Sequence, residues 1–441
     1  MQGESKEDGL EFRIKSVPAR RALMALEVAV LLGAVGWIVK VYAAYELSRN
    51  PSVENFELAV RLDPGNGEHR LKLGRLYQYN VADLQPEKAA EQFRRAAQLN
   101  PSQPQVWLEL AAGAEFQGKM KEAEEFLRRA DSLAPNSPAY QWPIANFYLL
   151  QGNIGEAFRH FRVVLAGTSR YDGIIFRTAW KASEDTERIL RDVIPKKLST
   201  EFSYLYFLSS QKKFTEAHAV WERIVNGPEP FTPQRCAGYI EALINARRPD
   251  QAFQVWTDMQ EKGLIRYPGG VAEDNLLTNG DFEDEMVNIA FGWQIAALEG
   301  VYAGLDVTTY HSPGHALLVR FAGTQNLHYM HVYQHVKVSP GRSYRLQAFV
   351  KTEGITTESG PRLEVRDAYD AAALDKVTEN LIGNTTGWNP TLLDFRTGPK
   401  TELLVVSLTR FPSRKLDSLI AGKVWVDDVR LTPLPESRGR P

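Results

Sequence analysis

Five of the eight histidines in this sequence lie in one short stretch, at positions 311, 315, 328, 331 and 335. Clustered histidines raise the question of a metal site, because imidazole is a common metal ligand. On a β-strand, however, His331 and His335 would lie about 13 Å apart, at about 3.3 Å per residue, too far to share one ion. His328 would face the opposite side of the strand. A cross-strand site with His311 or His315 stays open, and surface histidines are the simpler interpretation.

Other catalytic chemistry is poorly supported. The carboxylates of residues 283–285 would make a glycosidase pair only if two of them lay about 5–10 Å apart across a cleft. The sequence contains no glycine-rich phosphate loop, no HExxH helix and no nucleophile elbow. Cys236 is the only cysteine, so no internal disulfide and no cysteine-ligated metal site can form. We therefore expect a protein that is not an enzyme.

The overall composition is that of a chain with packed domains. Apolar residues make up 44% and charged residues 24%, and the formal net charge is -2. A nearly neutral chain has no general attraction to nucleic acid, so we expect no nucleic-acid partner. The length predicts about two to four domains.

An apolar segment near the N-terminus predicts a transmembrane helix over residues 22–46. Residues 22–39 read ALMALEVAVLLGAVGWIV, interrupted only by Glu27, and the apolar character resumes after Lys40. About 20 apolar residues are enough to cross a bilayer. Residues 41–43 could also mimic a signal-peptide cleavage site, and a buried helix of a soluble domain is a further alternative.

The flanking charges predict the orientation of this helix. Four basic residues precede it, Arg13, Lys15, Arg20 and Arg21, whereas Arg49 is the one basic residue between positions 41 and 60. The positive-inside rule places residues 1–21 in the cytoplasm as a tail. We expect a single-pass protein of a bacterial inner membrane, with its C-terminal domains periplasmic or otherwise extracytoplasmic.

A 34-residue period follows the anchor. Ala89, Ala123 and Ala157 are 34 residues apart (123 − 89 and 157 − 123). The same step separates Phe93, Leu127 and Phe161, and also Ala96, Ala130 and Val164. Small residues let two helices approach closely, and a bulky residue four positions later fills the gap to the next helix pair. The period therefore predicts stacked helical hairpins.

These positions resemble the tetratricopeptide repeat (TPR). The first unit departs from the pattern by three extra residues around positions 81–86, which predicts a longer turn. After residue 164 the resemblance weakens, but residues 173–194 and the Ala217–Trp221 and Ala252–Trp256 pairs predict further helices. We expect an all-α, TPR-like solenoid over residues 49–263.

The resemblance implies a concave surface that binds protein partners, whereas a solenoid that acts only as a spacer is the alternative. Six arginines recur on the predicted second helices and are expected to form solvated faces rather than a phosphate site. They are Arg94, Arg95, Arg128, Arg129, Arg159 and Arg162.

A predicted linker, residues 264–274, separates the solenoid from a segment with a different pattern. From Tyr344 to Val350, apolar and polar residues alternate, and short apolar runs recur at 316–321, 332–338, 403–408 and 424–431. Turn signals separate these runs, as at 339–341 (SPG). The pattern predicts an all-β antiparallel sandwich over residues 275–435, followed by a tail at 436–441.

Several motifs of this segment resemble the carbohydrate-binding modules of families 4 and 9, a jelly roll of the galactose-binding-like type. Residues 275–283 read NLLTNGDFE and 425–429 read WVDDV, with Gly292-Trp293, 314–317 (GHAL) and Gly387-Trp388 between them. Each motif is weak alone, but their order and spacing agree with the family over nearly all of residues 275–432.

The resemblance implies a structural calcium ion shared by the opening motif and the closing strand. The matching carboxylates are Asp281, Glu283, Asp427 and Asp428. They are the oxygen ligands that calcium prefers, although ordinary turn carboxylates are equally compatible with the pattern.

The resemblance also implies a glycan site, which needs aromatic faces and polar partners. The candidates are Tyr310, Tyr329, Tyr333, Gln334, Arg366 and Asp367. The resemblance implies the fold of this segment more strongly than it implies the ligand.

Together these features predict a multidomain, membrane-anchored scaffold. The solenoid would bind protein partners and the sandwich a glycan, in envelope or exopolysaccharide assembly. The alternative is a pure protein–protein assembly scaffold that binds no sugar.

Overall fold

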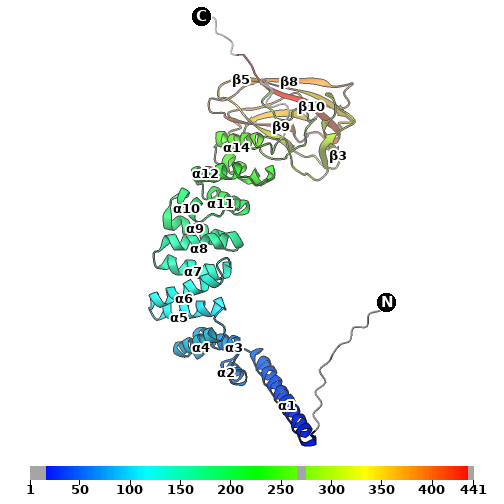
Figure 1. The fold of residues 1–441 in the computed structure, drawn as a ribbon. Coiled ribbons are helices and arrows are strands. Elements are labelled where there is room, and N and C mark those ends of the chain that lie inside the picture. Colours follow the sequence, from blue (N-terminus) through cyan, green and yellow to red (C-terminus); the bar gives the residue numbers. More distant parts are fainter. Residues whose placement is uncertain (1–15, 266–274, 436–441) are drawn as a thin grey trace, which may run out of the picture. The chain divides into compact units, whose positions relative to one another are not determined.

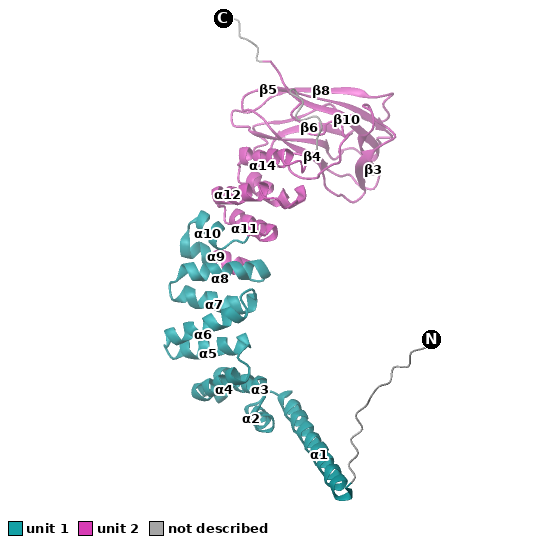
Figure 2. Ribbon diagram, viewed as in Figure 1, with its two compact units in different colours: residues 1–171, 178–195 teal, residues 172–177, 196–441 magenta. Residues whose placement is uncertain are grey.

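The computed structural model describes residues 16–265 and 275–435 (Figure 1). Most of the predicted N-terminal tail (1–15), most of the predicted linker (266–274) and the predicted C-terminal tail (436–441) lie outside the described residues. The chain forms two compact units, residues 1–171 with 178–195, and residues 172–177 with 196–441 (Figure 2). The first unit holds the N-terminal helix and the regular hairpins, and the second holds the last hairpins and all the strands of the described residues.

The predicted apolar segment lies within helix α1 (Val17–Ser48). Its long side chains are exposed along most of its length, as Leu32 and Trp37 illustrate at 68% and 66% exposure. Only Ala44, near its C-terminal end, is buried. A helix with this length and composition can cross a membrane, and a signal sequence has the same properties.

The predicted solenoid range contains helices and the turns that join them, and no strand. In the first unit, α2 (Val53–Leu62) precedes three hairpins, and α10 (Thr186–Asp192) and the second half of α9 (Asp172–Ser183) follow them. The hairpins are α3 (Gly67–Tyr79) with α4 (Pro86–Leu99), α5 (Pro104–Phe116) with α6 (Met120–Leu133), and α7 (Pro138–Leu150) with α8 (Ile154–Gly167). The remaining helices are α11 (Leu198–Ser210), α12 (Phe214–Val225), α13 (Ala237–Asn245) and α14 (Pro249–Glu261).

Close approach of the two helices in a hairpin explains the small residues of the period. Ala89, Phe93 and Ala96 are each at most 1% exposed. Phe93 packs so tightly on α3 that a Cβ built on Gly74 would lie 2.5 Å from its Cε1. The three extra residues of the first hairpin, α3 with α4, form a 3-10 turn, Val81–Asp83, which confirms the predicted longer connection.

The C-terminal segment forms two five-stranded antiparallel sheets, as predicted. Sheet A has the order β1-β4-β9-β6-β7, and sheet B the order β2-β3-β10-β5-β8. The strands of sheet A are β1 (Gln294–Ile295), β4 (Tyr329–Lys337), β6 (Arg362–Asp367), β7 (Asp375–Val377) and β9 (Leu403–Arg410). Those of sheet B are β2 (Val301–Asp306), β3 (Ala316–Ala322), β5 (Ser343–Glu353), β8 (Asn389–Arg396) and β10 (Ala421–Pro433).

The opening segment of the sandwich lies against its last strand. Leu276 N donates to Leu431 O at 2.9 Å, and Val429 N donates to Gly280 O at 2.7 Å. The Asn275 side chain donates to Val429 O and accepts from Leu431 N. Two motifs about 150 residues apart in the sequence therefore close the sandwich together.

The contact between Gly74 and Phe93 makes a stability prediction. We expect Gly74→Ala to lower the free energy of unfolding of the helices by about 1–3 kcal/mol, because the added methyl overlaps the Phe93 ring. The thermal unfolding midpoint should fall accordingly. Circular dichroism at a helical wavelength measures this. Gly113→Ala is the matched control, because its Cβ would lie 3.8 Å from the nearest atom, Gln78 Oε1. There helix propensity alone acts, and stability should rise by up to about 1 kcal/mol. Equal stabilisation by both substitutions would contradict the packing.

Candidate functional site

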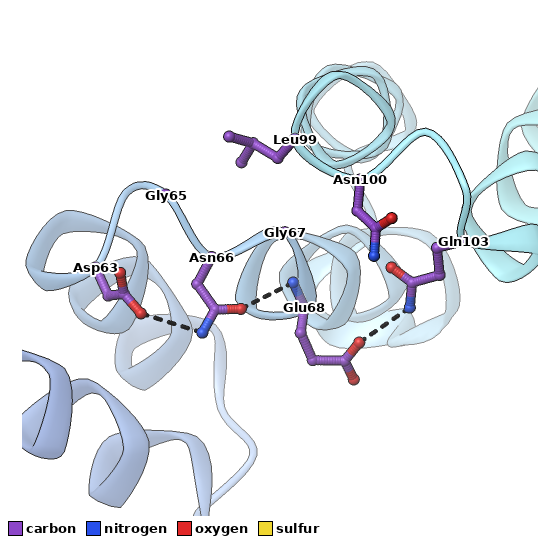
Figure 3. Close-up of a pocket in the computed structure, with 8 residues that line it drawn as sticks. All are labelled: Asp63, Gly65, Asn66, Gly67, Glu68, Leu99, Asn100 and Gln103. Atoms are coloured by element: carbon purple, nitrogen blue, oxygen red, sulfur yellow. Dashed lines mark hydrogen bonds between the residues drawn. The ribbon is translucent and has the colours of Figure 1, made fainter. Parts of the chain in front are cut away.

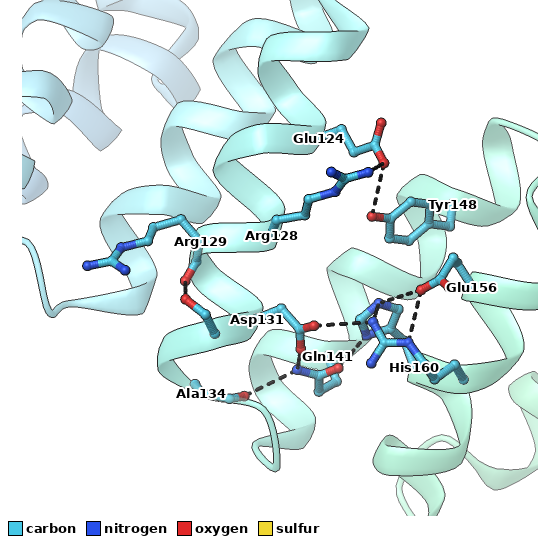
Figure 4. A network of polar contacts seen from close by, with 11 residues as sticks. Glu124, Arg128, Arg129, Asp131, Ala134, Gln141, Tyr148, Glu156 and His160 are labelled. Carbon is cyan, nitrogen blue, oxygen red and sulfur yellow. Dashed lines mark hydrogen bonds and ion pairs between the residues drawn. The ribbon is translucent and has the colours of Figure 1, made fainter.

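A buried histidine is the centre of a polar network between α6, α7 and α8 (Figure 4). His160 is 1% exposed, and its Nδ1 lies within hydrogen-bond distance of Gln141 Oε1. Arg159 Nη2 lies 2.8 Å from His160 Nε2. Gln141 in turn donates to Asp131 at 2.7 Å and to the carbonyl of Ala134 at 3.2 Å.

The donors around His160 determine its protonation. A guanidinium group can only donate, so His160 Nε2 must be the acceptor and Nδ1 must carry the proton that Gln141 Oε1 accepts. Burial and the neighbouring positive charge of Arg159 lower the pKa of His160 from 6.5 to about 4. The ring is therefore neutral at physiological pH, and it stacks on Tyr148 with ring centroids 5.5 Å apart.

A pocket of about 310 Å³ opens beside this network. Its charged groups pair with one another: Arg128 contacts Glu124 at 2.7 Å, and Arg159 contacts Glu156 at 2.9 Å and Asp131 at 3.2 Å. Three of the six predicted surface arginines are held by carboxylates, because Arg95 also pairs with Glu91 at 3.2 Å. This fits solvated, paired faces better than a phosphate site. The network acts as a polar connection between adjacent hairpins.

A second pocket, of about 470 Å³, lies where α2, α3, α4 and α5 meet (Figure 3). Asn66 caps α3, since its Oδ1 accepts from Glu68 N and His69 N. The Asn66 side chain also donates to Asp63, and Gln103 donates to Glu68, both at 3.1 Å. These polar groups satisfy one another, so the pocket is explained by helix capping and hairpin connection.

In the sandwich, Asp427 is a fully buried carboxylate of β10 that organises the loop between β2 and β3. Its Oδ2 accepts from the backbone N–H of His311 and Ser312 at 2.7 and 2.9 Å. Its Oδ1 accepts from Ser312 Oγ and from Asp428 N. Burial raises the pKa of Asp427, and the three backbone donors act against that rise.

Two of the other three carboxylates of the predicted calcium site, Asp428 and Glu283, also have protein partners. Asp428 lies 2.6 Å from His311 Nδ1, and Glu283 accepts from the backbone and the ring of His315 at 3.0 and 3.2 Å. Asp281 is exposed. Within residues 16–265 and 275–435, no group of three or more His, Cys, Asp or Glu side chains is placed to hold a metal. In this arrangement Asp427 does not fit a calcium ion, because both of its oxygens already accept two hydrogen bonds. Calcium binding elsewhere in the segment stays a prediction.

The six candidate glycan residues occupy different environments. Gln334 is fully buried and exchanges two hydrogen bonds of 2.9 Å with the backbone of Thr278. Tyr329 is 1% exposed within the core. Asp367 accepts from the backbone of residues 369 and 370, which closes a turn.

The remaining three candidates lie at or near a surface. Tyr333 and Arg366 are half-buried on sheet A, and the hydroxyl of Tyr333 donates to Gln294 Oε1 at 3.3 Å. Tyr310 is 44% exposed, but it belongs to the loop after β2 of sheet B. The structure thus brings Tyr333 and Arg366 to the same sheet and places Tyr310 beside the other one.

Sequence reasoning missed a contact between the last helix and the sandwich, both within the second unit. Lys337 Nζ of β4 lies 2.5 Å from Asp250 Oδ1 of α14 and 5.6 Å from the centre of the Phe253 ring. Phe291, in the loop before β1, contacts Phe253 and Trp256 with centroid distances of 5.2 and 6.0 Å. In the sequence, this contact is indicated only by Phe291, an aromatic residue in a loop beside the Gly292-Trp293 motif. This contact covers part of sheet A near Tyr333.

Comparison with known proteins supports the repeat interpretation. A tetratricopeptide-repeat family model matches residues 81–142, which include one complete hairpin, α5 with α6. These residues are therefore tetratricopeptide repeat in character, as the 34-residue period predicted. No curated protein matches the chain.

Several solved structures are similar to parts of the chain. MamA protein is 15% identical, over 45% of this chain and 98% of its own, with a TM-score of 0.29. A family 4 carbohydrate-binding module is 15% identical, over 36% of this chain and 99% of its own, with a TM-score of 0.25. The enzymatically active domain of tailspike protein 4 of Bacteriophage CBA120 is 17% identical over 36% of this chain, with a TM-score of 0.25, and this chain spans only 21% of it.

The neutral state of His160 predicts a pH dependence. Its pKa of about 4 lies below the ordinary 6.5, so the unfolded chain binds a proton that the folded network does not. The contribution of His160 to stability is complete above about pH 6.5, falls as the pH drops toward 4, and is then constant, with a total loss of about 2–3 kcal/mol. Amide exchange of α7 and α8, corrected for intrinsic rates, measures this. His160→Gln should flatten the dependence over this range, and an unchanged dependence in that variant would contradict the assignment.

The hydrogen bonds of Asp427 predict a local role. Asp427→Ala leaves three backbone donors unpaired and should destabilise the sandwich by about 3 kcal/mol. Asp394→Ala, which removes an exposed pair with Arg345, should cost less than about 1 kcal/mol. Thermal unfolding of both variants checks this. A calcium-dependent rise in the midpoint of the wild type that is lost in Asp427→Ala would instead assign this carboxylate to a metal site.

Proposed function

We propose that the chain is a membrane-anchored, non-enzymatic scaffold whose solenoid binds protein partners. The stack of hairpins, with tetratricopeptide character over residues 81–142, is the observation that carries this proposal. A hairpin stack buries its apolar faces between neighbouring hairpins and leaves long continuous surfaces for binding. The pocket beside His160 and the pocket beside Asn66 both have polar groups that pair with one another, so we propose a catalytic role for neither.

The N-terminal helix supplies the proposed anchor. It is apolar and long enough to span a bilayer, and basic residues precede it. We propose a single pass through a bacterial inner membrane, with the solenoid and the sandwich on the extracytoplasmic side. Assembly of the envelope or of an exopolysaccharide is the setting that the combination of these domains suggests.

Glycan binding by the sandwich is the finer part of the proposal. Tyr333 and Arg366 on sheet A, and exposed Tyr310 beside sheet B, are the residues left to contact a sugar. The packing of α14 on β4 favours the second candidate, a pure protein scaffold, because it uses part of sheet A for contact within the chain.

Two measurements on the full-length protein separate these functions, one in intact cells and one on the protein in lipid nanodiscs. Cross-linking in intact cells should capture discrete protein adducts, and an absence of adducts would contradict the scaffold. Affinity electrophoresis with envelope polysaccharides, calcium supplied, should retard the wild type if the sandwich binds glycan. Tyr333→Ala should then weaken the retardation about tenfold, because it removes the aromatic face that a sugar ring would contact. Tyr302→Ala, at an exposed tyrosine of β2, is the control and should change nothing. Mobility unaffected by every polysaccharide would leave the pure protein scaffold.

A further inference from the structure

Three large apolar side chains are exposed at the same repeat position in the first unit. Helices α3, α5 and α7 are each 13 residues long, and each ends on such a residue. Tyr79, Phe116 and Leu150 are 57%, 77% and 75% exposed. Exposed apolar residues scattered singly need no explanation, but a set that shares one structural position does.

The spacing of these residues follows the repeat. Leu150 comes 34 positions after Phe116, which is one period. Phe116 comes 37 positions after Tyr79, because the first hairpin, α3 with α4, has three extra residues. Helix α11 is also 13 residues long, but it ends at polar Ser210. A helix of this length can therefore end on a polar residue, and the apolar residue at this position is a feature of the first three hairpins. We call Tyr79, Phe116 and Leu150 the apolar row.

Two exposed lysines lie near the centre of the row, and the two carboxylates beside them, Glu115 and Glu122, are half-buried. Lys119 and Lys121 follow Phe116 and are exposed, and they form no ion pair with any described residue. Met120 lies between them, 37% exposed, and widens the apolar surface. A partner segment would gain from apolar side chains that match the row and from carboxylates near these two lysines.

The geometry of the row selects the form of that segment. Neighbouring first helices contact each other, and packed helices have axes about 8–10 Å apart. In an α-helix, positions seven residues apart lie on nearly the same face, about 10.5 Å from one another. In a β-strand, residues on one face are spaced by about 6.6 or 13 Å, which does not match. A helix laid along the row therefore places one apolar residue of every seven opposite each hairpin.

We propose that the apolar row docks an amphipathic helix of a protein partner, with large apolar residues at every seventh position and acidic residues beside Lys119 and Lys121. This inference rests on the proposed function of the solenoid and specifies where one partner binds and what its segment looks like. The row is separate from the two pockets described above, since none of its three residues lines either pocket.

A synthetic peptide tests the inference on the full-length protein in nanodiscs. The probe is a fluorescein-labelled helix of about three heptads with leucine at one heptad position and glutamate beside it. The control peptide has the same composition with the leucines moved off the seven-residue period. Fluorescence anisotropy should show binding of the first peptide and at least about tenfold weaker binding of the second.

Variants locate the binding surface. Phe116→Ser combined with Leu150→Ser should weaken the affinity at least about tenfold, and Lys119→Glu with Lys121→Glu should weaken it and reduce its salt dependence. Leu99→Ser is the matched control, because Leu99 is 45% exposed but ends a second helix, α4. It should bind like the wild type. All these side chains are exposed, so the thermal midpoints should stay unchanged, which separates lost docking from lost folding.

Two outcomes would overturn the inference: equal binding of both peptides, or wild-type affinity in the Phe116 and Leu150 double variant. The proposed function is judged separately by the cross-linked adducts in cells. If the double variant keeps every adduct of the wild type, the partners bind elsewhere on the solenoid, and the row is refuted while the scaffold stands. If the wild type yields no adduct, the scaffold itself fails.

Discussion

The close approach of two helices within each hairpin is the contact on which the rest of the solenoid depends. Where Phe93 meets Gly74 there is no room even for a methyl group, and Ala89 and Ala96 beside it are almost completely buried. Because the same kind of contact recurs every 34 residues, each hairpin repeats the orientation of the one before it. Every surface position of one hairpin is then repeated on the next, so a single choice of side chain becomes a continuous surface.

This constraint explains why the fold was largely predictable and the sites were not. The alanine and phenylalanine spacing is local and visible in the sequence, as is the alternation of Tyr344 to Val350. Which face of a strand meets the core is harder to predict. The register shift between Tyr329 and Val332 turns both side chains inward, so simple alternation misplaces one of them.

Distant polar contacts were the least predictable feature. Nothing near Asp427 in the sequence shows that it would hold the backbone of His311 and Ser312, more than a hundred residues away. The histidines and carboxylates that seemed to offer separate metal sites are instead partners of one another, as in the pairs His311 with Asp428 and His315 with Glu283. Likewise, the contact of Phe291 with α14 joins a loop of the sandwich to a helix of the solenoid. The sequence patterns of the two segments are unrelated, so neither pattern predicts the contact.

The solenoid and the sandwich differ in how much surface they leave for binding. Buried polar groups of the sandwich, such as Gln334 and Asp367, are used to fix its own loops, and part of sheet A contacts α14. The first hairpins instead keep apolar side chains exposed at one repeated position. This difference is the reason why we propose the solenoid as the first site of partner recognition, with the sandwich in a supporting or glycan-binding role.

Site-specific photo-cross-linking in intact cells tests this claim most directly. A photoreactive residue would be placed singly along the surfaces of α3 to α8 and across both sheets. We expect protein adducts whose yield rises and falls along the solenoid with the 34-residue period, with maxima near Phe116 and Leu150. Adducts that form only from the sandwich, or that show no relation to the repeat, would contradict it.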